Sequence, residues 1–226
     1  MNKLLLLACV FAFSLFAFAQ KIEERLNNEK FVRFVANKYN QDGVDRYTDW
    51  LTLLKKHQSD NTWVQLNAVN SFFNRQVDYY EDIAFWGKKD YWASPIETLG
   101  RGGGDCEDYA IAKYFSLLAL GVPENKLRLM YVRQLTLDVP HMVLIYFEEE
   151  NATPLVLDNF KRKVLPATKR PDLKPIYSFN GYGLWLSKAK GIGSKVRNQH
   201  GLKSWQSMID RIEEDLSTYN GEDNID

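Results

Sequence analysis

The hydrophobic residues of this chain repeat at helical spacing before Gly121 and alternate as in β-strands after it. Residues 127–135 alternate, 141–147 form an apolar run rich in β-formers, and 155–158 read as a further short strand after a turn at 148–154. A last amphipathic helix carries Leu202, Trp205, Ile209, Ile212 and Leu216. Helices followed by neighbouring strands predict an α+β fold, with a helical N-terminal half and an antiparallel sheet.

Apolar stripes predict three helices near the start and a fourth at 105–120, which Gly121 ends. We expect a turn at Asp42-Gly43 between the first two helices and an N-cap at Thr62 for the third. The stripes are interpreted as core and not as a cofactor site. They contain Ile22, Leu26, Phe31, Phe34 and Val35; Val44, Tyr47, Trp50, Leu51 and Leu54; Trp63, Leu66, Val69, Phe73 and Val77; and Ala110, Ile111, Tyr114, Leu117 and Leu118.

Residues 1–19 have the pattern of a secretory signal, with Lys3, an apolar run and an Ala17-Phe18-Ala19 cleavage site. The apolar run has about 15 residues, whereas a membrane-spanning helix needs roughly 20. A lipoprotein signal ending at Cys9 is the weaker alternative, since the apolar run continues past that residue. We therefore expect an exported, periplasmic protein with one domain at 20–219 and a polar tail at 220–226.

The charges of the 226-residue chain balance, because 29 basic residues face 29 acidic ones. A nucleic-acid binder would show a basic excess. Charged residues at 26% and aromatic residues at 14% argue against a disordered chain. Composition thus leaves the classes of folded enzyme, binding module and structural protein open.

Cys106 is the only cysteine after the predicted cleavage site, and it directly follows the glycine-rich stretch 100–104. It is expected at the start of a helix, with Asp105 as N-cap. Unpaired backbone N–H groups and the positive end of the helix dipole favour a thiolate there. Glycines 102–104 would let a substrate backbone approach closely. These features suit a nucleophile, although a buried, inert cysteine is the plainer alternative.

A thiol nucleophile needs a base, and the chain has three histidines. His57 and His200 lie in polar stretches and are interpreted as surface residues. His141 begins an apolar strand, and Asp158 ends the next one, so an antiparallel register could place the two side by side. The alternatives are a capping or core histidine and a turn aspartate.

Asp105, Glu107 and Asp108 surround the cysteine. Acidic residues are common in a first helical turn, but three of them would raise the thiol pKa and oppose the dipole. A bound cation would remove this conflict, and Ca²⁺ accepts irregular carboxylate geometry. The sequence has no EF-hand pattern, so backbone carbonyls would have to complete such a site.

Residues from about 60 to about 186 resemble the bacterial transglutaminase-like cysteine proteinases, and more narrowly periplasmic proteases of the LapG type. The motifs that carry the resemblance are GGDCEDYAIAKY at 103–114, YWASP at 91–95, HMVL at 141–144, LDN at 157–159, RPDL at 170–173 and YSFN at 177–180.

The resemblance implies a papain-like/transglutaminase-like fold, with the nucleophile helix packed on the sheet and a Cys106, His141, Asp158 triad. It implies calcium bound by acids that align with Asp105, Glu107 and Asp108. The implied activity is cleavage of the N-terminal region of a large surface adhesin at a di-alanine site, which releases the adhesin and disperses biofilm. The implied regulator is an inner-membrane cyclic-di-GMP receptor that sequesters the protease.

Three alternatives remain open from the sequence: a transglutaminase, an inactive binding module of the same fold, and a calcium-binding structural protein with a passive thiol. The oxyanion donors are equally open, with the Cys106 N–H and a side chain near Trp92 as candidates. Aromatic residues at 83–92 suggest either core packing or a docking surface, in which Trp86 or Trp92 would be an exposed anchor for the receptor.

Overall fold

A computed structural model of the chain describes residues 29–149, 152–181, 183–186, 195–197 and 202–221. The predicted signal segment 1–19 lies outside the described residues, and so do Ile22 and Leu26 of the first predicted helical stripe. Among the helices of the described part, none is long and apolar enough to cross a membrane. The C-terminal helix continues to Gly221, past the start of the predicted polar tail, and residues 222–226 are outside the description.

The predicted helices are present, together with shorter ones between them. They are α2 (Glu29–Lys38), α3 (Gln41–His57), α4 (Thr62–Gln76), α5 (Asp82–Phe85), α6 (Pro95–Arg101), α7 (Cys106–Ala119) and α8 (Lys203–Gly221). Two short 3-10 helices lie between α7 and α8: η1 (Glu124–Lys126) and η2 (Ala167–Lys169).

The strands form one antiparallel sheet and one small parallel pair. They are β1 (Asp78–Tyr79), β2 (Gly103–Gly104), β3 (Leu127–Gln134), β4 (Val139–Tyr146), β5 (Leu155–Leu157), β6 (Leu165–Pro166), β7 (Leu173–Asn180), β8 (Gly183–Leu186) and β9 (Lys195–Arg197). The described part of the large sheet has the order β6-β5-β4-β3-β7-β8-β9, with antiparallel neighbours throughout. The prediction of an α+β fold is confirmed.

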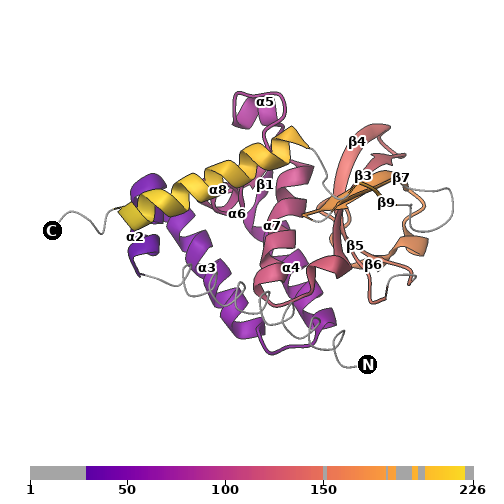
Figure 1. Ribbon diagram of the computed structural model, residues 1–226, viewed down its shortest axis with the longest axis horizontal. Coiled ribbons are helices and arrows are strands. Elements are labelled where there is room, and N and C mark those ends of the chain that lie inside the picture. The colour runs from indigo at the N-terminus through magenta and orange to yellow at the C-terminus, as the bar shows by residue number, and fades with distance from the viewer. Residues whose placement is uncertain (1–28, 150–151, 182, 187–194, 198–201, 222–226) are drawn as a thin grey trace.

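Helix α7 lies between the helical layer and the sheet, and α8 runs across the other helices (Figure 1). The buried residues of α7, among them Ile111, Tyr114 and Leu117, join one core that reaches α3 and α4 on one side and β3 and β4 on the other. Trp205 of α8 packs against Tyr114 and stacks on Phe115. A helix held on both sides gives the residue at its N-terminus a fixed position.

Four local expectations were wrong. Trp63, which was expected in the buried stripe of the third helix, is 53% exposed, because it lies on the solvent-facing side of the first turn of α4. Asp42 and Gly43 lie inside the first turn of α3, because Asn40 caps that helix by accepting a hydrogen bond from the Gly43 N–H. Asn61 caps α4, and Thr62 is its first helical residue. Strand β4 begins at Val139, two residues before His141.

The parallel pair β1–β2 fixes the glycine-rich loop before α7. Asp78 pairs with Gly103 and Tyr79 with Gly104, and the Tyr80 N–H donates to the Gly104 carbonyl at 3.0 Å. A β-carbon on Gly103 would lie 2.6 Å from the Phe85 ring, so this close approach requires glycine. The loop thereby sets Tyr79 beside the residues that lead into Cys106.

Candidate active site

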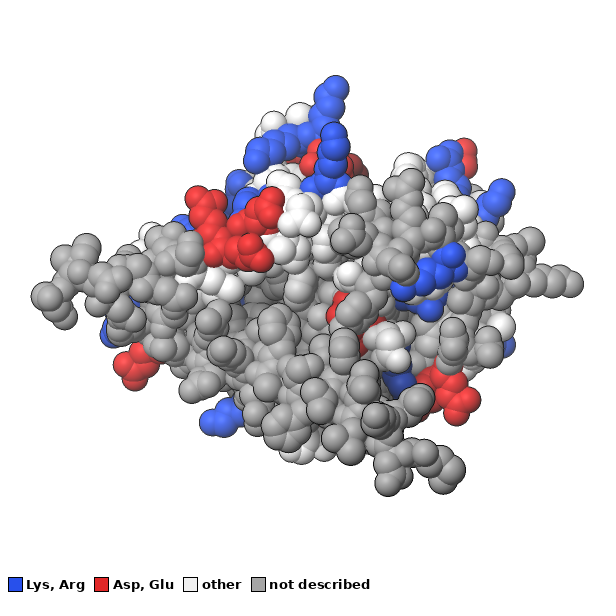
Figure 2. Space-filling view, in the orientation of Figure 1, with Lys and Arg blue, Asp and Glu red and all other residues white. Residues whose placement is uncertain are grey.

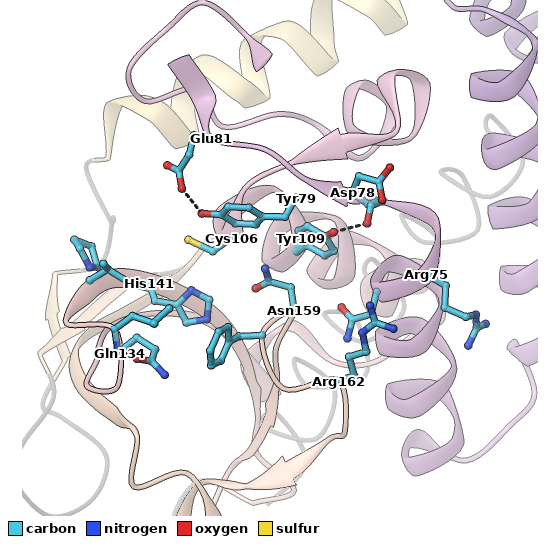
Figure 3. Close-up of a pocket in the computed structure, with 16 residues that line it drawn as sticks. Arg75, Asp78, Tyr79, Glu81, Cys106, Tyr109, Gln134, His141, Asn159 and Arg162 are labelled. Carbon is cyan, nitrogen blue, oxygen red and sulfur yellow. Dashed lines mark hydrogen bonds between the residues drawn. The ribbon is translucent and has the colours of Figure 1, made fainter. Parts of the chain in front are cut away.

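Cys106 and His141 line one open cleft of about 880 Å³ between the start of α7 and the end of the sheet (Figure 3). Tyr79 and Asn159 lie near them, and Arg75 and Arg162 lie farther along the cleft (Figure 3). Four exposed hydrophobic side chains line the cleft, Tyr79, Leu137, Val139 and Phe160, and exposed charged residues line it as well. An open cleft with hydrophobic and polar side chains can accept a segment of polypeptide.

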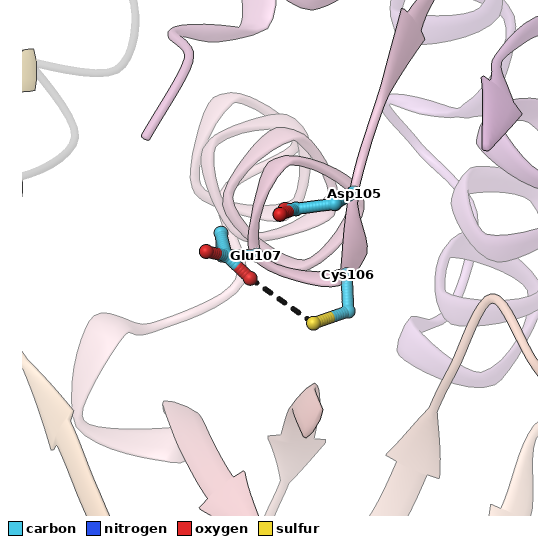
Figure 4. Close-up of side chains that lie close together, drawn as sticks. All are labelled: Asp105, Cys106 and Glu107. Carbon is cyan, nitrogen blue, oxygen red and sulfur yellow. Dashed lines mark hydrogen bonds between the residues drawn. The ribbon is translucent and has the colours of Figure 1, made fainter. Parts of the chain in front are cut away.

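Cys106 is the first residue of α7, as the sequence predicted, and it is partly exposed. Its Sγ donates to Glu107 Oε2 at 3.0 Å (Figure 4), and the Met142 backbone N–H bonds to the sulfur. Burial and the neighbouring carboxylates of Glu107 and Asp105 raise the pKa of the Cys106 thiol well above its usual value. The acidic neighbours therefore raise the thiol pKa and oppose the helix N-terminus, which favours the thiolate, as expected.

The structure brings His141 and Asp158 together. Strand β4 pairs with β5 so that Leu144 faces Leu157, and Asp158 follows β5 at the level of Val143. His141 Nε2 lies 2.8 Å from Asp158 Oδ1, and both residues are buried. A carboxylate only accepts, so Nε2 donates and leaves Nδ1 without its proton in the neutral ring.

Asp158 is enclosed by further polar groups. Its Oδ1 also accepts the Phe160 N–H at 3.0 Å, and Arg170 Nη2 donates to Oδ2 at 2.6 Å. Burial opposes ionisation of Asp158, but the bonds from His141, Phe160 and Arg170 outweigh it and lower the pKa to about 2. Asp158 is therefore ionised at neutral pH. Sequence analysis did not assign Arg170 a role.

Of the other two histidines, the structure describes only His57, and His57 is not in this site. His57 pairs with Asp60 at 2.7 Å at the end of α3, far along the chain from Cys106. His200 lies outside the described residues.

The three acidic residues predicted around Cys106 belong to a larger group. Carboxylate oxygens of Asp82, Asp105 and Asp108 lie within 4.8 Å of one another, and the same holds for Asp82, Asp90 and Glu107. Figure 4 shows Asp105 and Glu107 beside Cys106. Asp108 also anchors the loop, since its Oδ1 accepts the Ala93 N–H at 2.7 Å.

These acids are hard to keep ionised side by side. Burial, with Glu107 and Asp108 nearby, raises the pKa of Asp105 to about 11, and burial raises the pKa of Asp82 to about 6. One oxygen of each of these two aspartates is buried without a hydrogen-bond partner in the described structure. Crowded carboxylates with spare oxygens suit a hard cation.

Asp82 and Asp90 were missed from sequence because they lie 24 and 16 residues before Cys106, on and after α5. A signal was present in the acidic positions 81, 82 and 90 that flank the aromatic segment. Nothing in their spacing showed that α5 folds back over the start of α7.

Trp92 does not fulfil the prediction of an exposed anchor. Its ring is 7% exposed, stacks on Phe179 and donates through Nε1 to Asp90 at 2.8 Å, so it belongs to the core. Trp92 also lies outside the cleft lining, which removes its side chain as an oxyanion donor. Trp86 is half-buried, with the Arg101 guanidinium 4.4 Å from its ring centre.

Residues 30–172 match the model of the bacterial transglutaminase-like cysteine proteinases. The chain belongs to this family. It is a transglutaminase-like cysteine peptidase, and the papain-like/transglutaminase-like fold expected from the resemblance is confirmed. Among curated proteins, none matches the chain.

This transglutaminase-like cysteine proteinase is similar to solved structures of LapG from Legionella pneumophila. The calcium-bound LapG is 41% identical, with a TM-score of 0.70 over 80% of this chain and 97% of that one. The EGTA-treated LapG is 42% identical, with a TM-score of 0.71 over 81% and 96%. Calcium therefore binds a protein similar to this one.

Proposed function

We propose that this cysteine peptidase is a calcium-dependent, periplasmic endopeptidase that cleaves the N-terminal region of a large surface adhesin at a di-alanine site. Cleavage would release the adhesin and promote biofilm dispersal. One observation supports the peptidase site above all: Cys106, at the start of α7, shares a cleft with a buried His141–Asp158 pair. The similarity to LapG supports the choice of substrate.

In the proposed mechanism, His141 Nδ1 takes the proton of Cys106, and the thiolate attacks the scissile carbonyl carbon. Asp158 keeps the Nε2 proton in place and stabilises the imidazolium that forms. The Cys106 backbone N–H has no intrahelical acceptor at the first helical position, so it can donate to the oxyanion. His141 then protonates the leaving amine, and water hydrolyses the acyl-enzyme.

We propose that Asp82, Asp105, Glu107 and Asp108 hold the calcium ion. Asp90 lies at the edge of this proposed site, with a carboxylate oxygen within 4.8 Å of those of Asp82 and Glu107. Two observations fit such a site: the unpartnered oxygens of Asp82 and Asp105, and the raised pKa values of both. A divalent cation supplies positive charge there. Glu107 held by such a cation would no longer stabilise the protonated thiol through its present bond from Cys106.

We also propose that an inner-membrane cyclic-di-GMP receptor binds the segment around α5. Ile83 is 60% exposed beside half-buried Trp86, and basic side chains gather over α5 at the top of Figure 2. Trp86→Glu is expected to weaken receptor binding at least tenfold while peptide cleavage persists, because this ring is outside the cleft lining. Pull-down with the receptor's periplasmic domain would measure this loss of binding. Trp63→Glu is the matched control, because Trp63 of α4 is an exposed tryptophan. Equal binding by both variants would contradict the proposal.

Incubation of the exported form with an adhesin N-terminal fragment tests the activity itself. New N-termini at one site are expected from the wild type and none from Cys106→Ala, which exchanges one small side chain for a good helix former. Crosslinked amides in place of new N-termini would favour the transglutaminase alternative. Binding of the fragment without either product would favour an inactive binding module.

A further inference from the structure

Asp158 binds His141 through one oxygen and a buried arginine through the other. Arg170 is 2% exposed and lies at the end of η2, and its Nη2 donates to Asp158 Oδ2 at 2.6 Å. Asp158 Oδ1 accepts hydrogen bonds from His141 Nε2 and from the Phe160 N–H. Each oxygen of the carboxylate thus has its own donors, and the two sets come from different segments of the chain.

Arg170 is itself held in place. Its Nε and Nη2 both donate to Asp172, with distances of 2.9 to 3.3 Å, and Lys161 Nζ donates to Asp172 Oδ1 at 3.0 Å. The Leu135 N–H donates to the Asp172 carbonyl at 2.7 Å, which ties this segment to the end of β3. A guanidinium fixed by one carboxylate is a rigid donor for the other.

Successive ion pairs form a row of side chains from the surface to His141, and their charges alternate. The members in order are Lys161, Asp172, Arg170, Asp158 and the imidazole ring of His141. Without Arg170, Oδ2 of Asp158 would be a buried, unpaired anionic oxygen. The carboxylate could then turn about its Cβ–Cγ bond and lose the hydrogen bond to Nε2. The main chain of Asp158 would stay, since Asn74 Nδ2 holds its carbonyl oxygen at 2.8 Å.

We propose that Arg170 is a positioning residue of the active site: it fixes the rotation of the Asp158 carboxylate so that Oδ1 faces His141, and it acts on catalysis only through that carboxylate. The inference rests on the proposed triad. Arg170 does not line the cleft, so it is not expected to contact the peptide.

A double-mutant cycle on cleavage of the adhesin fragment tests the proposal. Arg170→Met is expected to lower kcat about 10- to 100-fold and to leave KM within about twofold, because orientation of the base is lost while the cleft is unchanged. In the Asp158→Asn background the same substitution is expected to cost less than about twofold. An equal fold-loss in both backgrounds would overturn the proposal.

Two further variants keep the test decisive if Arg170→Met fails to fold. Arg170→Lys keeps the charge and one donor and should recover part of kcat, and Asp172→Asn should lower kcat less than Arg170→Met does. Arg133→Met is the matched control, since Arg133 also pairs with an aspartate, Asp138, at 2.8 Å, and neither residue lines the cleft. Full kcat in both Arg170→Lys and Asp172→Asn would contradict a positioning role.

A proton NMR measurement on the whole protein separates this inference from the proposed substrate. The His141 Nε2 proton should appear far downfield in the wild type and in Arg133→Met, and it should be lost or exchange-broadened in Arg170→Met and Asp158→Asn. This measurement needs no substrate, so it still tests the role of Arg170 if the protein does not cleave the adhesin. An unchanged resonance in folded Arg170→Met would overturn the proposal.

Discussion

At the scale of single residues, two histidines of this chain bind an aspartate in nearly the same way. His57 Nδ1 lies 2.7 Å from Asp60, and His141 Nε2 lies 2.8 Å from Asp158. Only His141 lines the cleft. His141→Ala is expected to lower kcat by about 10³-fold or more, with the His141→Ala, Cys106→Ala double variant scarcely worse, because triad members act as a unit. His57→Ala should cleave at the wild-type rate; an inactive His57→Ala would refute the assignment of the base.

A second prediction at this scale concerns Lys113, which is 1% exposed on α7 and donates to Asn74 at 2.8 Å. Burial, partly offset by Asp158, lowers its pKa from 10.5 to about 7. Between these values the unfolded chain binds a proton that the native protein lacks, so this lysine makes the free energy of unfolding rise with pH. The full effect of one proton is about 1.4 kcal/mol per pH unit.

Urea denaturation at pH 7, 8 and 9 would measure this slope in the wild type and in Lys113→Met. Other titrating groups are common to both proteins and cancel in the comparison. The wild type is expected to gain stability relative to the variant as the pH rises. Parallel curves would show that Lys113 keeps its proton in the native state.

The sequence was informative about residues whose type is rare or whose place is marked locally. His141 and Asp158 each stand out at one end of an apolar strand, and Cys106 follows a glycine-rich break. Asp82 carries no such mark, and Arg170 stands in the RPDL motif at 170–173, which assigns it no role in the site. They reach the site only because η2 folds beside β5 and α5 folds over the start of α7, and such long-range placement is not written in local spacing.

At the scale of elements, helices α3 and α6 approach closely at a glycine. A β-carbon on Gly43 would lie 2.3 Å from the Gly100 carbonyl oxygen, which belongs to the backbone and cannot rotate away. Gly43→Ala is therefore expected to lower the free energy of unfolding by roughly 1–3 kcal/mol. Thr52→Ala, on the exposed face of the same helix, should change it by less than about 0.5 kcal/mol. Equal urea midpoints for the two variants would contradict close packing here.

Helices were easier to predict than strands for a physical reason. The helical stripes are mostly buried, with Trp63 as an exposed exception, whereas β7 has exposed Lys174, Pro175 and Ile176 and becomes buried only toward Phe179. Its hydrophobicity does not alternate over its length, so residues 173–180 gave no strand signal. The place of β7 next to β3 depends on pairing between residues far apart in the chain, such as Leu129 with Phe179, which local patterns do not determine.

At the scale of the whole molecule, one helix joins the two functional parts. The sheet supplies His141 and Asp158, and the helical side, with α5 and the loop before α6, supplies Asp82 and Asp90. Helix α7 carries Cys106 between them, flanked by Asp105, Glu107 and Asp108. The sequence predicted the α+β class and the groups around Cys106, His141 and Asp158, but it could not predict that α5 and the residues of the sheet both lie near the N-terminal end of α7.

The most direct test of the account is adhesin-fragment cleavage in EGTA, followed by addition of Ca²⁺ or Mg²⁺. We predict that EGTA stops cleavage, that Ca²⁺ restores it, and that Mg²⁺ restores it poorly because it requires a tight octahedral shell. Asp105→Ala with Glu107→Ala should stay inactive in excess Ca²⁺, whereas Asp210→Ala with Glu213→Ala, two exposed acids of α8, should behave as wild type. Full cleavage in EGTA would contradict the account and leave the acids around Cys106 as ordinary residues of a helix start.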